Sequence, residues 1–174
     1  AGAFTYAPLT GCSPLTVSFN ATTSNVPSII WDFSDGHTST VSFTDTISHV
    51  YTLPGAYVPK LILSDGTGCQ NSSIGTDTIK VDLVTAKFTT DPNPVCIGDT
   101  FTFVDSSTSF WSTINTWNWS INGNSSSIAS PSFFISGVGT YPATLTVTDG
   151  WGCTATLIKD VTIYDLPVIK ACPD

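Results

Sequence analysis

Apolar and polar residues alternate along several short stretches of the chain. In residues 15–19 the apolar side chains Leu15, Val17 and Phe19 are separated by polar ones, a period of two that puts one set of side chains on one face of a β-strand. Trp31 and Phe33 also lie two residues apart, directly before a Ser-Asp-Gly turn sequence that ends at Gly36. Because two large aromatic side chains on one face need an opposing sheet to cover them, the pattern predicts an all-β sandwich.

Further strands follow from the same pattern and from the turn residues between them. Tyr57 follows a Pro-Gly turn and enters an aliphatic segment, where β-sandwiches place a corner tyrosine whose hydroxyl returns to the backbone. In the first half of the chain we expect strands at residues 3–6, 15–19, 29–33, 38–42, 46–51, 58–63 and 76–83.

The second half repeats the first at a constant offset of 84 in the numbering (96 minus 12). A tryptophan strand also recurs, because Trp117 and Trp119 precede a turn at Asn122 and Gly123; its predicted offset is 86, with Trp117 matching Trp31. The repeat predicts two tandem sandwiches of about seven strands, at residues 1–84 and 85–166, with residues 167–174 beginning a following module or linker. The pairs at offset 84 are Cys12 and Cys96, Gly55 and Gly139, Tyr57 and Tyr141, Asp65 and Asp149, Gly66 and Gly150, Gly68 and Gly152, and Cys69 and Cys153.

Composition narrows the class further. Hydrophobic residues make up 41% of the 174 residues and charged residues only 10%, which indicates a folded chain. The formal net charge of −8, with five Lys and no Arg, excludes a cationic footprint for nucleic acid. No apolar run approaches the roughly 20 residues that span a bilayer, so we expect no membrane insertion.

The first half contains a Trp-Asp-Phe-x-Asp-Gly turn, a His-x-Tyr-x-x-x-Gly-x-Tyr segment and an Asp after the next strand. With these motifs it resembles the PKD (polycystic kidney disease) domain family. The second half is similar but divergent, with Asn118 and Asn122 in place of aspartates and with Phe133 and Ile135 at the His49 and Tyr51 positions. The residues of the first copy are Trp31 to Gly36, His49, Tyr51, Gly55, Tyr57 and Asp65.

The resemblance implies an immunoglobulin-like fold within a large secreted or cell-surface protein of a Bacteroidetes-type bacterium, a class of proteins often exported by type IX secretion. It implies a non-catalytic stalk or adhesin module, whose partners are neighbouring domains and, as further candidates, surface glycans or other cell-surface proteins. An accessory carbohydrate-binding module of a secreted enzyme is the alternative. A filament-forming role is a third interpretation.

Five cysteines without a Cys-x-x-Cys spacing indicate disulfides in an oxidising compartment. The equal separation within each half (69 minus 12 and 153 minus 96, both 57) suggests Cys12–Cys69 and Cys96–Cys153 bridges, but in a PKD-like sandwich these partners fall at opposite ends of strands. With the two modules stacked end to end, we expect instead a Cys12–Cys153 bridge between modules, a Cys96–Cys172 bridge to the next module, and Cys69 bonded to a module upstream.

The loop aromatics Phe110, Trp111 and Trp151 are expected at the joint between modules, with a sugar platform as the alternative. His37 and His49 have no metal ligand at the usual spacing, and no Gly-x-Ser-x-Gly motif occurs, so we expect neither a metal-binding histidine pair nor an enzyme.

Calcium and glycans are the remaining candidate ligands. Asp32, Asp35 and Asp65 are weak candidates for Ca²⁺, although turn formation explains them better, and no other cofactor is expected. The Asp-Thr-Ile sequences at Thr46 and Thr78 resemble bacterial O-glycan acceptor motifs.

Overall fold

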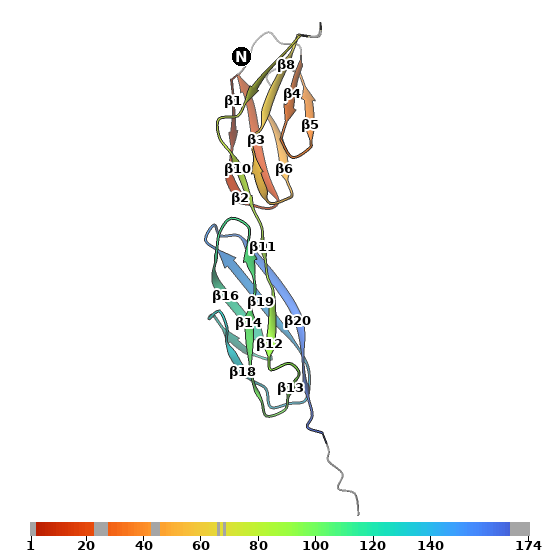
Figure 1. Ribbon diagram of the computed structural model, residues 1–174, viewed down its shortest axis with the longest axis vertical. Helices are drawn as coiled ribbons and strands as arrows, with labels where there is room; N and C mark the ends of the chain where they lie inside the picture. The colour runs from red at the N-terminus through yellow and green to blue at the C-terminus, as the bar shows by residue number, and fades with distance from the viewer. Residues whose placement is uncertain (1–2, 23–27, 43–45, 66, 68, 168–174) are drawn as a thin grey trace, which may run out of the picture. The chain divides into compact units, whose positions relative to one another are not determined.

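The structure is a computed structural model that describes residues 3–22, 28–42, 46–65, 67 and 69–167. The described residues form β-strands and no helix, so they contain no helix that could cross a membrane. The chain divides into two compact units, Ala1–Leu83 and Val84–Asp174 (Figure 1). The prediction of an all-β chain is confirmed, and each unit is described below by itself.

The first unit consists of two facing layers. One layer is the sheet β1-β3-β6, in which β3 pairs antiparallel with both neighbours. The other layer contains the sheet β5-β4-β8-β9 and the short sheet β2-β10-β7, where β2 runs parallel to β10. The strands are β1 (Ala3–Ala7), β2 (Thr10–Cys12), β3 (Leu15–Thr22), β4 (Ser28–Asp32), β5 (Thr38–Val41), β6 (Thr46–Tyr51), β7 (Gly55–Tyr57), β8 (Lys60–Ser64), β9 (Gln70–Ile74) and β10 (Ile79–Asp82).

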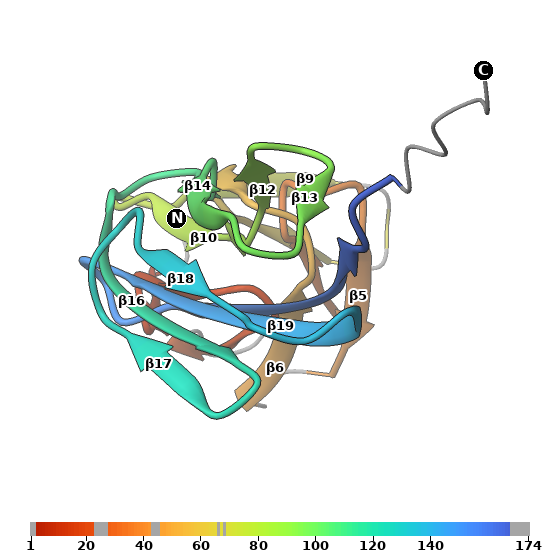
Figure 2. The same cartoon turned by 90° about the horizontal axis from the view of Figure 1, so that it is seen from below.

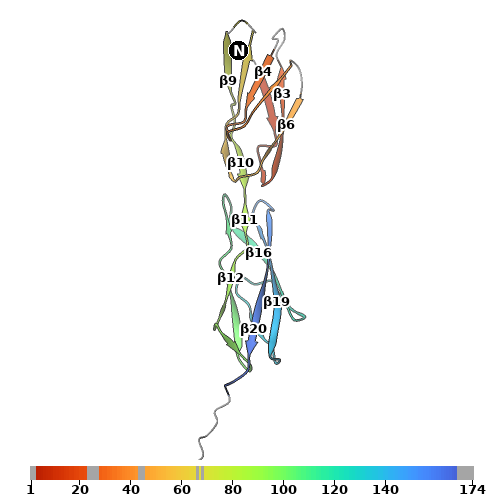
Figure 3. The ribbon, with the colours of Figure 1, turned by 90° about the vertical axis from the view of Figure 1, so that its right-hand side faces the viewer.

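The second unit has the same two-layer plan with a larger second sheet. The sheet β12-β14-β18 forms one layer, and the sheet β13-β20-β19-β16-β17 forms the other (Figures 2 and 3). A short pair, β11 (Val84–Thr85) with β15 (Thr108–Ser109), completes the unit. The other strands are β12 (Phe88–Asp91), β13 (Val95–Cys96), β14 (Thr100–Asp105), β16 (Ile114–Ile121), β17 (Asn124–Ser126), β18 (Ser132–Phe134), β19 (Gly139–Asp149) and β20 (Thr154–Tyr164).

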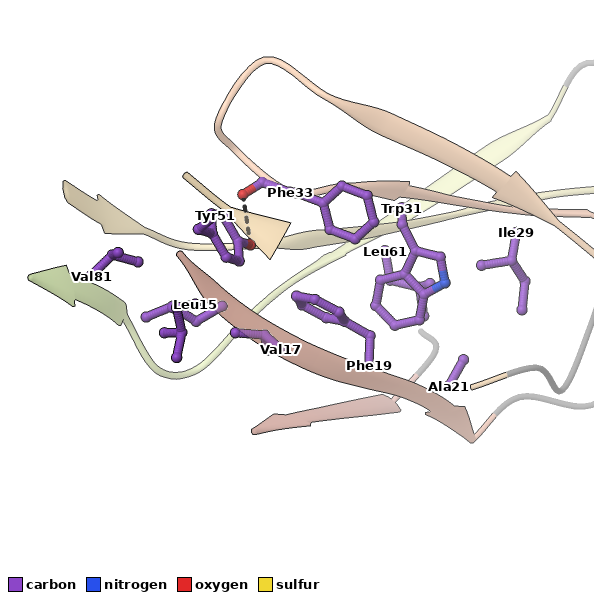
Figure 4. Packing of buried hydrophobic residues seen from close by; sticks show 11 residues of the cluster. Leu15, Val17, Phe19, Ala21, Ile29, Trp31, Phe33, Tyr51, Leu61 and Val81 are labelled. Carbon is purple, nitrogen blue, oxygen red and sulfur yellow. Dashed lines mark hydrogen bonds between the residues drawn. The ribbon is translucent and has the colours of Figure 1, made fainter. Parts of the chain in front are cut away.

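Alternation along β3 builds the core of the first unit. Its apolar side chains are buried and its polar ones exposed in strict alternation, because successive residues of a strand point to opposite faces. Trp31, Phe33 and Phe19 pack together between the layers, with ring centroids 5.2–5.3 Å apart for Phe19 against the other two (Figure 4). The aromatic motif therefore faces the opposing sheet, as the sequence pattern predicts.

The tryptophan strand of the second unit is shifted from its expected register. Trp31 lies opposite Leu61, and Trp119 lies opposite Leu145. The two leucines differ by 84 in the numbering (145 minus 61), but the tryptophans differ by 88 (119 minus 31). The second unit thus has four additional residues before this strand, and the predicted offset of 86, which matched Trp117 to Trp31, is wrong.

Backbone conformation supports the offset of 88. Ser34 and Asn122, which differ by 88 in the numbering (122 minus 34), have positive φ angles of 62° and 46°. Trp117 is only half-buried, and its indole N–H donates to Asp105 at 2.8 Å. A shift of two residues keeps every side chain on the same face of the strand, which is why the alternation pattern alone did not reveal it.

Three short strands of the first unit, β2, β7 and β9, were not predicted, and β7 lies where a turn was expected. β9 has the sequence Gln-Asn-Ser-Ser-Ile and is mostly exposed at the edge of its sheet. β2 has only three residues and is held by its parallel pairing with β10. Neither segment has an apolar face, so neither gives the period-two signal from which the other strands were predicted.

Candidate functional site

The turn between β4 and β5 has an unusual backbone held by polar side chains. Ser34 and Gly36 have left-handed φ angles of 62° and 94°, and the Phe33 N–H donates to the His37 carbonyl oxygen at 3.1 Å. The Asp32 carboxylate accepts the Ser34 N–H at 2.8 Å. Asp and Ser suit this position because their short side chains bond to nearby backbone groups.

Asp35, at the tip of this turn, joins it to strand β6. One of its carboxylate oxygens accepts the His37 N–H at 3.0 Å, and the other lies 2.6 Å from Nε2 of His49. The side chains of Asp35 and His49 are only 13% and 15% exposed, whereas that of His37 is 75% exposed. Burial raises the pKa of the Asp35 carboxyl, but the bonds from His49 and His37 outweigh it and hold that pKa below its ordinary value.

Aromatic rings fix the imidazole of His49. Its ring lies parallel to that of Phe33 with centroids 3.9 Å apart, and it meets Tyr51 edge-on at 4.7 Å. Tyr51 in turn donates its buried hydroxyl to the carbonyl oxygen of Phe33 at 3.0 Å (Figure 4). Phe33, directly after β4, and Tyr51 of β6 therefore orient the histidine toward Asp35.

The second unit has an apolar residue at the corresponding position. His49 lies opposite Val17, and Phe133 lies opposite Phe101, so both partners are displaced by 84 in the numbering (133 minus 49 and 101 minus 17). Phe133 is buried and packs against Phe103 with centroids 5.2 Å apart. The pairing of a histidine with the turn aspartate is thus a feature of the first unit.

The structure brings three metal-binding groups together at this turn. Ligand atoms of Asp35, His37 and His49 all lie within 4.8 Å of one another. The sequence predicted no metal-binding histidine pair and so did not indicate this arrangement. His37 and His49 lie on different segments, on either side of β5. The turn and β6 belong to opposite layers and meet only where the two layers pack together, so no signal within either segment could have revealed the group.

The three aspartates considered for calcium do not converge in the described residues. Asp32 bonds to Ser34 and lies 3.4 Å from Nζ of Lys60. Asp65 bonds instead to Thr67 through both its carboxylate oxygens and to the Cys69 N–H. The backbone N–H and the hydroxyl of Thr67 donate to the Asp65 carboxylate, and these bonds hold the pKa of Asp65 below its ordinary value. The contacts of Asp32 and Asp65 are therefore those of turn-forming side chains.

The corner tyrosines have the same geometry in both units. Tyr57 donates to the carbonyl oxygen of Leu53 at 3.0 Å, and Tyr141 donates to that of Gly137 at 3.1 Å. In each case the hydroxyl returns to the backbone four residues earlier in the chain. These bonds fix the turn that leads into the long central strands.

The loop aromatics of the second unit do not form a flat platform. Phe110 and Trp111 are 56% and 39% exposed, and Trp151 is 40% exposed. The rings of Phe110 and Trp111 meet at 76° with centroids 5.3 Å apart, so one sugar ring could not stack on both. Their expected place at a joint between modules stays a prediction.

The cysteines are not equivalent. Cys12 and Cys153 are disulfide-bonded, whereas Cys69 and Cys96 carry free thiols. The alternative of Cys12–Cys69 and Cys96–Cys153 bridges within each module is therefore wrong. Cys172 lies outside the described residues, so its pairing with Cys96 stays a prediction, as does a bond from Cys69 to an upstream module.

The remaining candidate sites are surface features. Thr46 begins β6 and is exposed, while Thr78 precedes β10 and is half-buried; both stay predicted O-glycan acceptors.

A hollow of about 200 Å³ beside β20 and another of about 160 Å³ between β1 and β9 are smaller than the usual small-molecule site. Near the Asp35–His49 pair, the Ser34 hydroxyl donates to the Val58 carbonyl oxygen rather than to the histidine, so serine and histidine do not form a nucleophile–base pair there.

Comparison with known proteins is consistent with this geometry. Residues 5–81 match the PKD domain family, and no curated protein matches the chain. Similar solved structures include the PKD1 domain of Vibrio anguillarum Epp, at 24% identity and a TM-score of 0.43 over 48% of this chain and 95% of that one. The PKD1 domain of the Vibrio cholerae metalloprotease PrtV is 25% identical, with a TM-score of 0.40 over 45% of this chain and 94% of that one.

A further similar solved structure covers nearly the whole chain. The fibronectin(III)-like modules of Clostridium thermocellum CbhA are 14% identical, with a TM-score of 0.40 over 98% of this chain and 100% of that one. The family match covers only the first unit, where the Trp-Asp-Phe-x-Asp-Gly turn, His49 and the corner tyrosine Tyr57 are found. The chain therefore matches the PKD domain family over residues 5–81, which lie within its first unit.

Proposed function

We propose that this chain is a non-catalytic spacer, made of two tandem PKD-type modules, within a longer extracellular protein. The observation that carries the proposal is the short connection between the two compact units. Strand β10 ends at Asp82 and β11 begins at Val84, so Leu83 alone separates the last strand of one unit from the first strand of the next. A connection this short has little freedom of its own, which suits a module that holds other domains at a distance.

Features shared by the two units support reading the second as another PKD-type module. Both have a left-handed residue after the tryptophan strand and a corner tyrosine bonded four residues back. In both, an aspartate lies at the end of the strand that pairs with the tryptophan strand and accepts backbone N–H groups two and four residues later. Asp65, directly after β8, accepts from Thr67 and Cys69, and Asp149, the last residue of β19, accepts from Trp151 and Cys153.

A Cys12–Cys153 disulfide is part of the proposal. Cys12 belongs to the first unit and Cys153 to the second, and both are disulfide-bonded while Cys69 and Cys96 are free. A bridge between modules would remove much of the bending freedom of the joint. Disulfides persist in oxidising compartments, which supports an extracellular location, as does the PKD family itself.

Peptide mapping without reduction tests the bridge directly. The protein is alkylated under denaturing conditions, digested and analysed by mass spectrometry before and after reduction. We expect a cross-linked species that contains Cys12 and Cys153, and no cross-link from either of them to Cys69 or Cys96. A Cys12–Cys69 peptide, or alkylated Cys12 in the oxidised protein, would contradict the proposal.

Carbohydrate binding is the second candidate, and the exposed rings of Phe110, Trp111 and Trp151 are the observation that favours it. Aromatic side chains of this kind are common in recognition surfaces. A glycan array probed with the whole chain separates the two functions: a spacer gives no signal above background, whereas a binding module gives a signal that Trp151→Ala abolishes.

A further inference from the structure

We propose that Asp35, His37 and His49 form a binding site for a single divalent transition-metal ion of the Zn²⁺ class. The three side chains come from the β4–β5 turn and from β6, and their ligand atoms lie within 4.8 Å of one another. This inference is independent of the proposed spacer function. It also differs from a calcium site, because its donor set is two imidazole nitrogens and one carboxylate.

The distances are close to those of a metal site. Ligands about 2.0–2.2 Å from a tetrahedral Zn²⁺ lie roughly 3.3–3.5 Å from one another. Nδ1 of His37 lies 3.3 Å from Oδ1 of Asp35, which already meets this requirement. Nε2 of His49 lies 2.6 Å from Oδ2 of Asp35, a hydrogen-bond distance. The ion would replace the bonded proton, and the two groups would separate by about 0.7 Å to admit it.

Two of the three ligands are held in place before any metal binds. The His49 ring is fixed by the parallel ring of Phe33 at 3.9 Å and by the edge contact with Tyr51. Asp35 is fixed by the His37 N–H and is only 13% exposed. Ligands that are oriented by neighbouring groups lose less freedom on binding, so such a site binds more tightly than a flexible one.

The third ligand is on the surface and makes the site open. The side chain of His37 is 75% exposed, and its imidazole can turn about its side-chain bonds to meet the ion. An ion held by three protein groups keeps a fourth position for water or for a donor from another molecule. The location on an exposed turn leaves that position accessible from solvent.

The chemistry of the donors selects the class of ion. Imidazole suits Zn²⁺, Cu²⁺ and Ni²⁺, whereas Ca²⁺ and Mg²⁺ require six or more oxygen ligands. The described site provides two nitrogens and one carboxylate. The Asp32 carboxylate accepts the Ser34 N–H and pairs with Lys60, so it does not supply further oxygens to the site. We therefore expect Zn²⁺ to bind and Ca²⁺ not to bind.

Calorimetric titration of the tag-free chain with ZnCl₂ tests the site. The free thiols of Cys69 and Cys96 are alkylated first, because thiolates also bind zinc. We expect one Zn²⁺ per chain and a rise in the melting temperature on binding. His37→Ala should weaken binding at least about tenfold and abolish the rise, since loss of an outer-shell partner alone costs roughly 10- to 100-fold.

Two variants keep the result interpretable. Thr38→Ala changes the exposed residue next to His37, at the start of β5, and should bind Zn²⁺ as the parent does. His49→Phe copies Phe133 of the second unit and should also lose binding. Because His37 is mostly exposed, His37→Ala should fold normally even if His49→Phe does not. Absence of zinc binding in the parent, or unchanged affinity in His37→Ala, would overturn the proposal.

Discussion

At the scale of single residues, short polar side chains determine the backbone at the turns. Asp32 and Asp65 each accept the N–H of the residue two positions later, at 2.8 Å, and the first of these bonds supports a left-handed Ser34. The abundance of Asp and the absence of Glu in the chain reflect this use, because the longer Glu side chain does not form the same local bond.

Tyr51→Phe tests the buried hydrogen bond that joins β6 to the aromatic motif. The variant leaves the Phe33 carbonyl oxygen without the hydroxyl that it accepts from at 3.0 Å. We expect the free energy of unfolding to fall by about 1–3 kcal/mol, the cost of an unsatisfied buried acceptor. Chemical denaturation measures the change, and Tyr164→Phe, at a side chain 53% exposed, is the control that should change little. Equal stability of both variants would contradict the structural role.

Asp65→Asn tests the effect of the turn carboxylate on acid stability. The pKa of Asp65 is lowered in the fold, so its contribution is present above the unfolded value of 3.8 and is lost as pH falls through the lower folded value. The amide oxygen of Asn can still accept the Thr67 N–H but does not titrate in this range. When the free energy of unfolding is measured at neutral pH and at pH 2, we expect it to fall less in the variant than in the parent. An equal or larger loss in the variant would contradict the assignment.

At the scale of elements, much of the fold could be predicted because the strands alternate. Strand β6 was predicted with its observed bounds, Thr46–Tyr51, and β3 and β4 within a few residues. The polar edge strand β9 was missed because edge strands are held by backbone pairing rather than by an apolar face. The cluster of Asp35, His37 and His49 was missed for a different reason. His37 and His49 become neighbours only when β6 pairs in the sheet opposite the turn, and local patterns carry no information on such contacts.

Register is the element-scale feature that alternation could not predict, and a pair of variants tests it. Trp119 is fully buried against Phe103 and Phe88, whereas Trp117 is half-buried with its N–H bonded to Asp105. We expect Trp119→Ala to cost about 3–5 kcal/mol and Trp117→Ala at most about half of that. Thermal or chemical unfolding of the two variants measures the difference. If Trp117→Ala were the more damaging change, the match of Trp119 to Trp31 would be incorrect.

At the scale of the whole molecule, the chain combines two compact units and a very short connection. Cys12 and Cys153 are disulfide-bonded, whereas Cys69 and Cys96 carry free thiols. Each unit has its own aromatic core, so each has the means to fold as a domain. Within the described residues, the hollows are small and the Ser34 hydroxyl is bonded away from His49. The two compact units and their short connection support the proposed spacer function.

The central proposal is that the short connection and a Cys12–Cys153 bridge restrict motion between the two modules, and backbone ¹⁵N relaxation measured by NMR tests it most directly. If the short connection and the Cys12–Cys153 bridge hold the modules together, both should report the same rotational diffusion tensor, that of the whole 174-residue chain. If the bridge contributes, the rotational diffusion of the two modules should differ more in the Cys12→Ser, Cys153→Ser double variant than in the parent. Two separate correlation times in the oxidised parent, each typical of a domain half that size, would contradict the account.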